Sequence, residues 1–393
     1  MVFLLSSHNV FEYLIEQRIC DPKEQYPSQI KPKDCKNFNL LVSFANDRHL
    51  LVKQERHDSQ GRTHGEFWNE WRIQQFLQTL PALSPIRSLI SEVIHFDPSR
   101  SIIVLNYLND YCDLADFYYK EQRFPTTIAA AVGVMLATIH RTTLEQQAYQ
   151  DCLNQNGRET SIDKAPNLLR GLEQIGPEIF GRVCADGLKF FRLYQRYESL
   201  GQAISELNAA WSPCCLIHYD LRLSNLLLHL EWEQVRSSAE PSHPPMVRLI
   251  DWEKFKWGDP AYDLGTLIAG YLKLWLRSLV VNSAIDVETA LRLAETPLEQ
   301  IQPSLVALTQ AYFEHFPTIL ERRPDFFRRV LQFAGFLLIK KIWIKIDCRK
   351  PFDNRGICML QAAKTLLCYP EQSIPAVFGV TASELITPSL VTA

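Results

Sequence analysis

Two stretches of the sequence decide the fold: CLIHYDLRLSNLLLHL, residues 215–230, and VRLIDWEKFKWGDPAYDLGTLI, residues 247–268. Each contains a short apolar run that suits a small strand and that ends in polar side chains. In the first stretch, His218, Asp220 and Asn225 follow the apolar run. A His-x-Asp pair alone is common and is also typical of a loop salt bridge, so the interpretation depends on the second stretch.

In the second stretch, the apolar run is followed directly by Asp251. Carboxylates are expensive to bury unless a cation pairs with them. Mg²⁺ prefers oxygen ligands and usually holds phosphate oxygens at the same time. We therefore interpret Asn225 and Asp251 as metal ligands. Asp220 is then free to orient a substrate hydroxyl and to accept its proton while a phosphoryl group is transferred in line.

The motifs in these stretches resemble those of a known family. HYDLRLSN, residues 218–225, matches the H-x-D-x4-N catalytic loop of aminoglycoside phosphotransferase-like kinases, a family that includes choline kinases. IDWE, residues 250–253, and GDPAYDL, residues 258–264, match its metal-site and following-helix signature. The resemblance implies an α+β, two-lobed, protein-kinase-like fold, with a small antiparallel-sheet N-lobe over residues 1–108 and a larger, mainly helical C-lobe over residues 109–393. ATP is expected between the lobes.

The resemblance also implies roles for individual residues. Asp220 is the expected catalytic base, and Asn225 and Asp251 are the expected Mg²⁺ ligands. Lys53 is expected to contact the α- and β-phosphates of ATP, with Glu70 as its ion-pair partner. ATP and Mg²⁺ are thus the expected cofactors.

Four further positions follow from the same family pattern. Backbone groups of Asn106 and Leu108, in the strand that connects the lobes, are expected to meet the adenine edge. His218 and Asp263 are expected to support the catalytic loop.

Some of these assignments have competing interpretations. A lysine at a strand end is usually a solvated edge charge, but LLVKQ places Lys53 among apolar residues and ahead of a glutamate-bearing helix. Glu66 lies one helical turn before Glu70 and competes with it as the partner of Lys53. His140, in LATIHRTT, is interpreted as a packed or capping residue rather than a catalyst.

The sequence departs from the family pattern at three places. Tyr219 stands where the family often has a small residue, and Arg222-Leu223-Ser224 replaces the usual small or proline-containing sequence. The loop at residues 231–245 lengthens the separation of the motifs, as either an insertion or a substrate-facing element. No glycine precedes Gly61, so a glycine-rich loop and a Walker A motif are absent before Lys53, which argues against an ordinary protein kinase. The lysines of residues 31–37 are expected near the phosphates instead.

Hydrophobic periodicity predicts the other elements. An amphipathic helix with a capping box at Asn9 and Glu12 opens the chain. The hairpin NFNLLVSF and RHLLVKQ, a helix and two strands follow, over residues 37–44, 48–54, 66–80, 92–96 and 101–108. Helices dominate from Asp110 onward, with apolar stripes at residues 128–139 and 330–344. Short strands interrupt them at residues 216–217, 226–230 and 247–250.

The composition excludes several classes of protein. The chain has 393 residues, 47% of them hydrophobic, and a net charge of −3 from 41 Lys and Arg against 44 Asp and Glu. Such a chain is neither disordered, collagen-like nor a coiled coil. Because the net charge gives no overall positive field to attract a phosphate backbone, we expect no nucleic-acid partner.

The cysteines and the N-terminus predict where the protein is found. Ten cysteines are scattered from Cys20 to Cys368 without a C-x-x-C pair, which is typical of reduced thiols. The N-terminus has no basic region and no small-residue cleavage site, so it does not predict a signal peptide. The longest uncharged run, residues 124–139, is shorter than the ~20 apolar residues that span a bilayer. We expect a cytoplasmic protein with no membrane partner.

The expected activity is transfer of the γ-phosphoryl group of ATP to a hydroxyl of a small molecule. Two alternatives share the fold: a protein or peptide kinase, and a pseudokinase that binds nucleotide and acts through a partner. The enzyme is favoured because a pseudokinase typically lacks at least one of the four groups present here, Lys53, Asp220, Asn225 and Asp251.

The identity of the acceptor stays open, as do antibiotic resistance, a protein partner and the oligomeric state. Asp110, Asp113 and Asp116 are interpreted as an ordinary solvated face, with a site for a cationic substrate as the alternative.

Overall fold

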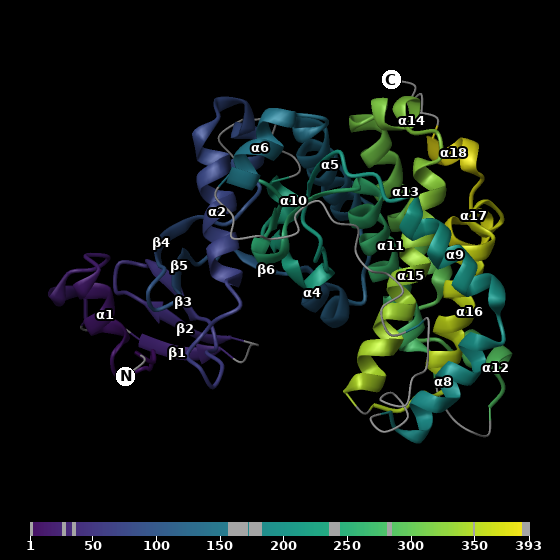
Figure 1. The fold of residues 1–393 in the computed structure, drawn as a ribbon, viewed down its shortest axis with the longest axis horizontal. Helices are drawn as coiled ribbons and strands as arrows, with labels where there is room; N and C mark the ends of the chain where they lie inside the picture. The colour runs from purple at the N-terminus through teal and green to yellow at the C-terminus, as the bar shows by residue number, and fades with distance from the viewer. Residues whose placement is uncertain are drawn as a thin grey trace. The chain divides into compact units, whose positions relative to one another are not determined.

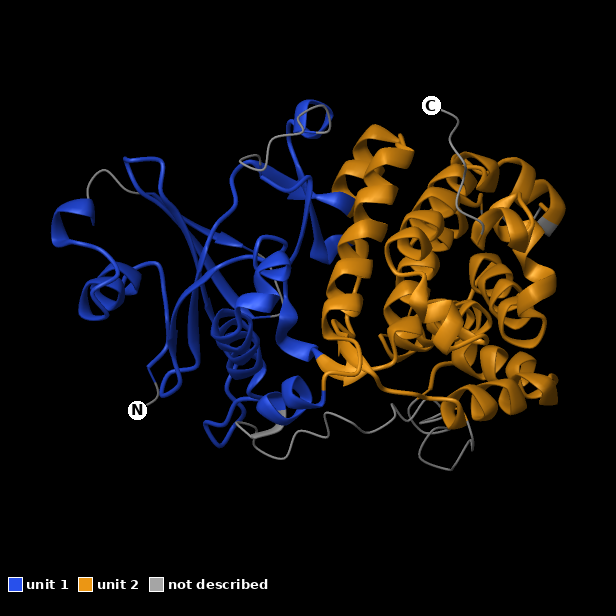
Figure 2. Cartoon of the chain, turned by 90° about the horizontal axis from the view of Figure 1, so that it is seen from above, with its two compact units in different colours: residues 1–114, 147–159, 224–255 blue, residues 115–146, 160–223, 256–393 orange. Residues whose placement is uncertain are grey.

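The computed structural model describes residues 3–25, 29–33, 37–155, 172, 183–235, 244–280, 285–348 and 350–386. The chain forms two compact units, each assembled from three separate stretches of sequence (Figure 2). Unit 1 comprises residues 1–114, 147–159 and 224–255; unit 2 comprises residues 115–146, 160–223 and 256–393. The predicted division into lobes after residue 108 stays a prediction.

Unit 1 is built on a five-stranded antiparallel sheet (Figure 1). Its strands lie in the order β1 (Gln29–Lys33), β2 (Phe38–Ser43), β3 (His49–Gln54), β5 (Ile102–Asn106) and β4 (Val93–Asp97). The predicted hairpin is confirmed as β2 and β3, and Asp47 in its turn has a φ of 60°, a left-handed conformation that Asp tolerates. The two later predicted strands are confirmed as β4 and β5.

The central strands β3 and β5 bury side chains on both faces of the sheet, since successive side chains of a strand point to opposite sides. On β5, Ile102 and Val104 join a core formed with helix α1 (Val10–Glu16) and strands β2 and β3. Ile103 and Leu105 join a second core with Phe67. Phe67 belongs to helix α2 (Glu66–Thr79), which confirms the helix predicted after the hairpin.

Strand β1 was not among the predicted strands. Four of its five residues are exposed, so it lacks the apolar alternation that marks a strand in sequence. Pro32 has no backbone N–H to donate to a neighbouring strand. It is tolerated because β1 is an edge strand, which pairs with β2 on one side only. Of the stretch 31–37, residues 34–36 lie outside the described residues.

The opening helix is confirmed, but its predicted capping box is wrong. Asn9 is the N-cap of α1, yet its side chain makes no capping bond to the helix. Its Oδ1 accepts a hydrogen bond from Ser6 N at 2.7 Å, and its Nδ2 donates to Leu4 O at 2.9 Å. The side chain therefore stabilises the turn that precedes the helix.

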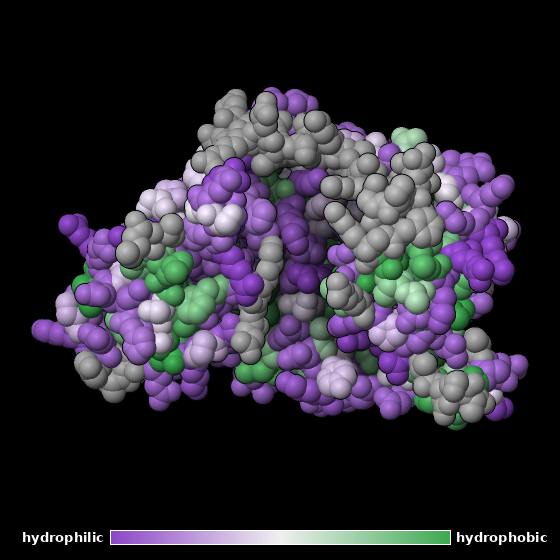
Figure 3. All heavy atoms as spheres, turned by 60° about the horizontal axis from the view of Figure 1, so that its bottom comes forward, coloured by the Kyte–Doolittle hydropathy of each residue, from purple (hydrophilic) through white to green (hydrophobic). Residues whose placement is uncertain are grey.

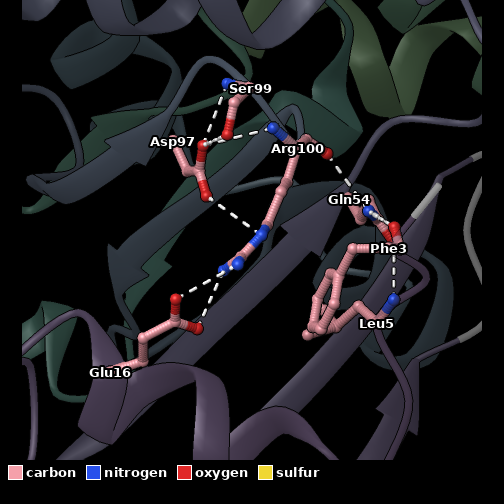
Figure 4. A network of polar contacts seen from close by, with 7 residues as sticks. All are labelled: Phe3, Leu5, Glu16, Gln54, Asp97, Ser99 and Arg100. Atoms are coloured by element: carbon pink, nitrogen blue, oxygen red, sulfur yellow. Dashed lines mark hydrogen bonds and ion pairs between the residues drawn. The ribbon is translucent and has the colours of Figure 1, made fainter. Parts of the chain in front are cut away.

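A polar network ties the N-terminal segment to the sheet (Figure 4). Gln54 of β3 accepts a hydrogen bond from Leu5 N at 2.7 Å and donates to Phe3 O at 2.8 Å and to Arg100 O at 3.1 Å. Arg100 also forms two bonds to Glu16 of α1, at 3.0 and 3.1 Å. The segment before α1 is thus held by buried side-chain bonds as well as by its apolar residues.

A second, three-stranded sheet of unit 1 has the order β6 (Tyr111–Asp113), β8 (Leu226–His229) and β9 (Val247–Leu249). Strands β8 and β9 confirm two of the predicted short strands. Short helices complete the unit: α3 (Ser84–Arg87), α6 (Gln147–Gln155), α10 (Trp232–Val235) and the 3₁₀ turns η1 (Pro22–Gln25), η2 (Pro81–Leu83) and η4 (Trp252–Lys254). Within the predicted loop at 231–245, residues 236–243 lie outside the described residues.

Unit 2 is mainly helical, so with the sheets of unit 1 it confirms the predicted α+β class. Its four longest helices among the described residues are α5 (Thr126–Thr143), α11 (Pro260–Ser278), α13 (Leu298–His315) and α15 (Phe326–Asp347). Helix α5 packs on α13, and α15 packs on α16 (Asn354–Cys368).

The remaining elements are α8 (Ala185–Gln195), α9 (Glu198–Ala209), α12 (Val287–Arg292), α14 (Thr318–Arg322), α17 (Pro370–Phe378), α18 (Ala382–Ile386) and the paired strands β7 (Cys215–Ile217) and β10 (Lys256–Gly258). Helix α4 (Leu114–Glu121) begins on the last residue of the first stretch of unit 1, and η3 (Leu223–Asn225) spans a unit boundary.

The first predicted apolar stripe is the buried face of α5. The second, over residues 330–344, lies on α15 and is buried at Val330, Leu331 and Ile342, but its last residue, Ile344, is 44% exposed. All five residues of the first stripe are at most 2% exposed: Ile128, Val132, Met135, Leu136 and Ile139. Helices α11 and α15 pack closely at Gly265, because a Cβ there would lie 2.7 Å from Val330 O. Only glycine permits this approach.

The surface in Figure 3 is mostly hydrophilic, with separate small hydrophobic patches. No single helix among the described residues is long and apolar enough to cross a bilayer; α5 passes on length and composition only when joined with α6 as a bent pair.

Candidate active site

Lys53 is a buried cation of unit 1. It lies on β3, is 9% exposed, and its Nζ donates to Asp251 Oδ1 at 2.7 Å. Burial by itself lowers the pKa of the Lys53 ammonium, but the carboxylates of Glu70 and Asp251 outweigh burial and raise this pKa above its usual value. Lys53 is therefore a buried, permanently charged ammonium rather than a solvated edge lysine.

Of the two competing glutamates, Glu70 is the one whose charge acts on Lys53. Glu70 lies on α2 and is 2% exposed, and burial raises its pKa to about 7 although Lys53 opposes this shift. Glu66, at the start of α2, is half-buried and accepts a 3.5 Å bond from Asn37. Lys53 bonds directly to Asp251, and Glu70 acts on Lys53 through its charge. The role of Glu70 as the ion-pair partner of Lys53 stays a prediction.

Asp251 follows β9 and takes a strained backbone conformation, with φ 60° and ψ 59°. A non-glycine residue in this left-handed region costs on the order of 1–3 kcal/mol and is often found at functional sites. The turn after it is fixed by Trp252, whose Nε1 donates to Leu249 O at 3.3 Å, and by Asn69 of α2, whose Nδ2 donates to Glu253 O at 3.2 Å. The Asp251 side chain is 32% exposed.

Asn225 precedes β8 and lies at the same end of the β8–β9 pair as Asp251. Its carbonyl accepts Ile250 N at 3.0 Å, and the residue itself is 2% exposed. Among the described residues, no three His, Cys, Asp or Glu side chains form a group that could hold a metal. An amide and a carboxylate fit Mg²⁺ nevertheless, because this ion is usually held by few protein oxygens together with phosphates and water.

The two predicted adenine contacts lie at the end of β5, which closes with Asn106, and in the segment after it, which contains Leu108. Asn106 N donates to Glu92 O at 3.0 Å, and Leu108 O accepts a 3.3 Å bond from Tyr111 N. Lys33 of β1 donates to the Tyr107 hydroxyl at 2.7 Å, between these two positions in sequence. These bonds fix the backbone of the segment, and its contact with adenine stays a prediction.

In unit 2, a buried carboxylate holds the H-x-D loop. Asp263 of α11 is fully buried; its Oδ2 accepts His218 N at 2.6 Å and its Oδ1 accepts Tyr219 N at 3.0 Å. His218 Nδ1 in turn accepts Asp220 N at 3.3 Å. The backbone that precedes Asp220 is thus oriented by one carboxylate. His140, which is also fully buried, lies with its Nε2 3.6 Å from Asp263 Oδ2.

Tyr219 occupies the position where the family often has a small residue. Its φ is 65°, a left-handed conformation that is unfavourable for a bulky side chain. Its ring stacks on Tyr262 with 4.8 Å between centroids, and Lys256 Nζ lies 4.3 Å from the ring centre. These contacts offset the backbone cost.

Asp220 has a direct partner that the sequence analysis did not identify as functional. Arg222 Nη2 lies 3.1 Å from Asp220 Oδ2, and the two side chains are 54% and 21% exposed. Arg222 lies two residues after Asp220 in the same loop, and this spacing alone did not predict that the two side chains form an ion pair.

A buried ion pair of unit 2 was also missed. Asp259 is the N-cap of α11, accepts Ala261 N at 3.0 Å, and forms an ion pair with Arg329 of α15. Burial raises the pKa of Asp259, although Arg329 opposes it. The sequence signal for the cap was present, because Asp before Pro260 is typical of a helix start. No signal in the sequence indicated that Asp259 pairs with Arg329.

The chain belongs to the phosphotransferase enzyme family APH: the family model matches residues 36–280, more than half of the chain. The match includes every residue from Lys53 to Asp263 discussed above. It confirms the predicted family and supports phosphotransferase activity.

Solved structures share the fold. The GDP complex of aminoglycoside 2'-phosphotransferase-IIIa is similar over 91% of this chain and 99% of that chain, with 14% identity and a TM-score of 0.51. A choline/ethanolamine kinase family protein from Mesorhizobium loti covers 94% and 99% of the two chains, with 16% identity and a TM-score of 0.49. No curated protein matches the sequence. At these identities the first likeness shows the fold alone, and it confirms the predicted protein-kinase-like fold.

Proposed function

We propose that this protein transfers the γ-phosphoryl group of ATP to a hydroxyl group of a small molecule. The observation that carries the proposal is the 2.7 Å bond between Lys53 Nζ and Asp251 Oδ1 in a chain of the phosphotransferase family. It sets a buried cation beside a carboxylate at the end of β9, where Asn225 is the neighbouring oxygen ligand.

The transfer assigns one task to each group. The acceptor oxygen forms a bond to the γ-phosphorus, the bond from that phosphorus to the β,γ-bridging oxygen breaks, and ADP leaves. Asp220 orients the acceptor hydroxyl and takes its proton. Lys53 positions the α- and β-phosphates, and Glu70 keeps Lys53 charged. His218 and Asp263 orient the loop that carries Asp220.

Asn225 and Asp251 are the residues that would hold Mg²⁺. When bound, Mg²⁺ neutralises charge on the phosphate oxygens. Because Lys53 already bonds Asp251, the same lysine fixes the orientation of this carboxylate.

Backbone groups of Asn106 and Leu108 would meet the base of the nucleotide. We assign ATP as the donor; since the structure of aminoglycoside 2'-phosphotransferase-IIIa contains GDP, GTP is the comparison that tests this assignment.

The test is incubation of the full chain with Mg²⁺, a fractionated cell extract and either γ-labelled ATP or γ-labelled GTP. We expect label from ATP in the small-molecule fraction with wild type and its loss with Asp220→Asn. Binding of Mg-ATP to this variant should be unchanged. The control is Asp286→Asn, which alters a carboxylate that caps the separate helix α12.

Three outcomes would contradict the proposal. Equal labelling by Asp220→Asn removes Asp220 from the mechanism. Asp220-dependent label in protein indicates the protein or peptide kinase. Nucleotide binding without Asp220-dependent label in any fraction indicates the pseudokinase.

A further inference from the structure

Five cations of unit 2 form what we call the basic cluster. Arg222 comes from the loop after β7, Lys273 and Arg277 come from α11, and Lys341 and Lys345 come from α15. Burial first, and then the charges of the other four members, lower the pKa of Lys273 to about 8. Because four cations act on Lys273, positive charge is concentrated around this residue.

The basic cluster adjoins the proposed catalytic base. Arg222, one of its members, lies 3.1 Å from Asp220 Oδ2. The next residue, Leu223, packs on α11, because a Cβ at Gly270 would lie 3.3 Å from Leu223 Cγ. The loop with Asp220 therefore lies along the helix that carries Lys273.

The four helical members of the cluster have no ion-pair partner within the described part of the chain. Burial and the neighbouring cations lower the pKa of Lys345, and the charge of Asp353 opposes them. Half-buried like charges repel one another strongly where the dielectric is low. A bound anion would offset this repulsion, and a cationic ligand would increase it.

We propose, on the basis of the phosphotransferase function above, that the acceptor is an anionic hydroxyl compound. Its carboxylate or phosphate binds the basic cluster, and its hydroxyl lies at Asp220. The hydroxyl oxygen forms the new bond to the γ-phosphorus and passes its proton to Asp220, so the anionic group is held and not consumed. The chain as a whole has a net charge of −3, so this positive site is local.

The first test measures binding to the full chain by calorimetry. The probes share one sugar scaffold and differ in charge: glucose 6-phosphate, glucose and glucosamine, with the pair glycerate and glycerol as a second scaffold. We expect the two anions to bind and the neutral and cationic probes to bind at least tenfold more weakly. Lys341→Met/Lys345→Met should weaken anion binding at least tenfold.

The matched control removes two exposed cations of the same unit, Lys120→Met/Arg328→Met, and should change affinity by less than twofold. Removing like charges from α15 relieves repulsion, so the double variant should remain folded. Arg277→Met, at an exposed position, provides a second variant with a smaller loss of the same sign. The proposal is overturned if the neutral or cationic probes bind as well as the anions, if no anion binds, or if the control weakens binding equally.

The second test measures transfer from γ-labelled ATP to the same probes. We expect label on an anionic probe, with a KM for that probe at least tenfold higher in Lys341→Met/Lys345→Met and an unchanged KM for ATP. A change in the KM for ATP alone would assign the cluster to the nucleotide and overturn the proposal. Anion binding that depends on Lys341 and Lys345, without any transfer, would keep the anion site and reject the phosphotransferase function.

Discussion

Lys53 Nζ and Asp251 Oδ1 lie 2.7 Å apart although 198 residues separate them in sequence. The contact joins the five-stranded sheet of unit 1 to Asp251, two residues beyond the end of β9. The carboxylate of Glu70 also acts on Lys53 through its charge, and its buried Oε2 has no hydrogen-bond partner among the described residues. Lys53 thus balances the charges of two carboxylates, Glu70 and Asp251.

Replacing Lys53 by Met should remove that balance. We expect kcat/KM for ATP to fall at least 100-fold, because the phosphates lose their lysine. The free energy of unfolding should fall by about 2 kcal/mol, less than for a fully buried pair because Asp251 is partly exposed. Steady-state kinetics and urea unfolding measure the two effects. Lys254→Met, which removes an exposed lysine nearby, is the control.

The double variant Lys53→Met/Glu70→Gln separates stability from activity. Neutralising Glu70 removes a buried carboxylate that Lys53 no longer compensates, so most of the lost stability should return while activity stays low. If the double variant is instead less stable than Lys53→Met alone, Lys53 does not stabilise the fold by compensating the charge of Glu70.

Asp263→Asn should damage the loop before Asp220. The carboxylate accepts two backbone N–H groups, those of His218 and Tyr219, whereas an amide offers one oxygen and turns a donor toward the other. We expect kcat to fall at least tenfold with the KM for ATP unchanged, and a loss of about 1–3 kcal/mol in unfolding free energy. An altered KM for ATP with normal kcat would contradict a positioning role.

The sequence predicts those features that depend on local pattern. Strands β3 and β5 and helices α2 and α5 are marked by runs and stripes of apolar residues that the structure buries. Strand β1 has no such mark, since an edge strand that exposes both faces looks like a polar loop. A hydrophobic pattern in the sequence indicates which residues are buried, and four of the five residues of β1 are exposed.

The site divides in the same way. The residues of the H-x-D loop and Asp251 could be proposed in advance because the spacing of their motifs matches the family pattern. The partners could not: Arg222 of Asp220 and Arg329 of Asp259 are ordinary arginines until the chain folds. Which charge meets which carboxylate is decided by tertiary packing, over a separation of 70 residues for Arg329.

The pair of Arg329 and Asp259 should be the most sensitive charge contact in unit 2. Both side chains are at most 3% exposed, so Arg329→Met leaves a buried carboxylate without its cation. Loss of one partner of a buried pair costs about 3–5 kcal/mol. Arg328→Met, which removes the exposed neighbour paired with Glu371, should cost less than about 1 kcal/mol. Urea unfolding compares the two, and equal losses would show that burial of the pair is unimportant.

Lys273 should make stability depend on pH in the alkaline range. Its pKa is lowered from 10.5 to about 8 in the folded chain. Between these values the unfolded chain holds a proton that the folded chain has released, so this residue adds to stability as the pH rises. The slope approaches at most about 1.4 kcal/mol per pH unit.

Subtracting the unfolding free energy of Lys273→Met from that of wild type removes the contributions of other groups. This difference should rise by about 1 kcal/mol from pH 7.5 to 9, measured by urea unfolding at each pH. The same subtraction with Lys120→Met should be flat, because Lys120 is exposed. A flat or falling difference for Lys273 would mean that the other four members of the basic cluster do not repel it. The concentrated charge on which the anionic acceptor depends would then be absent.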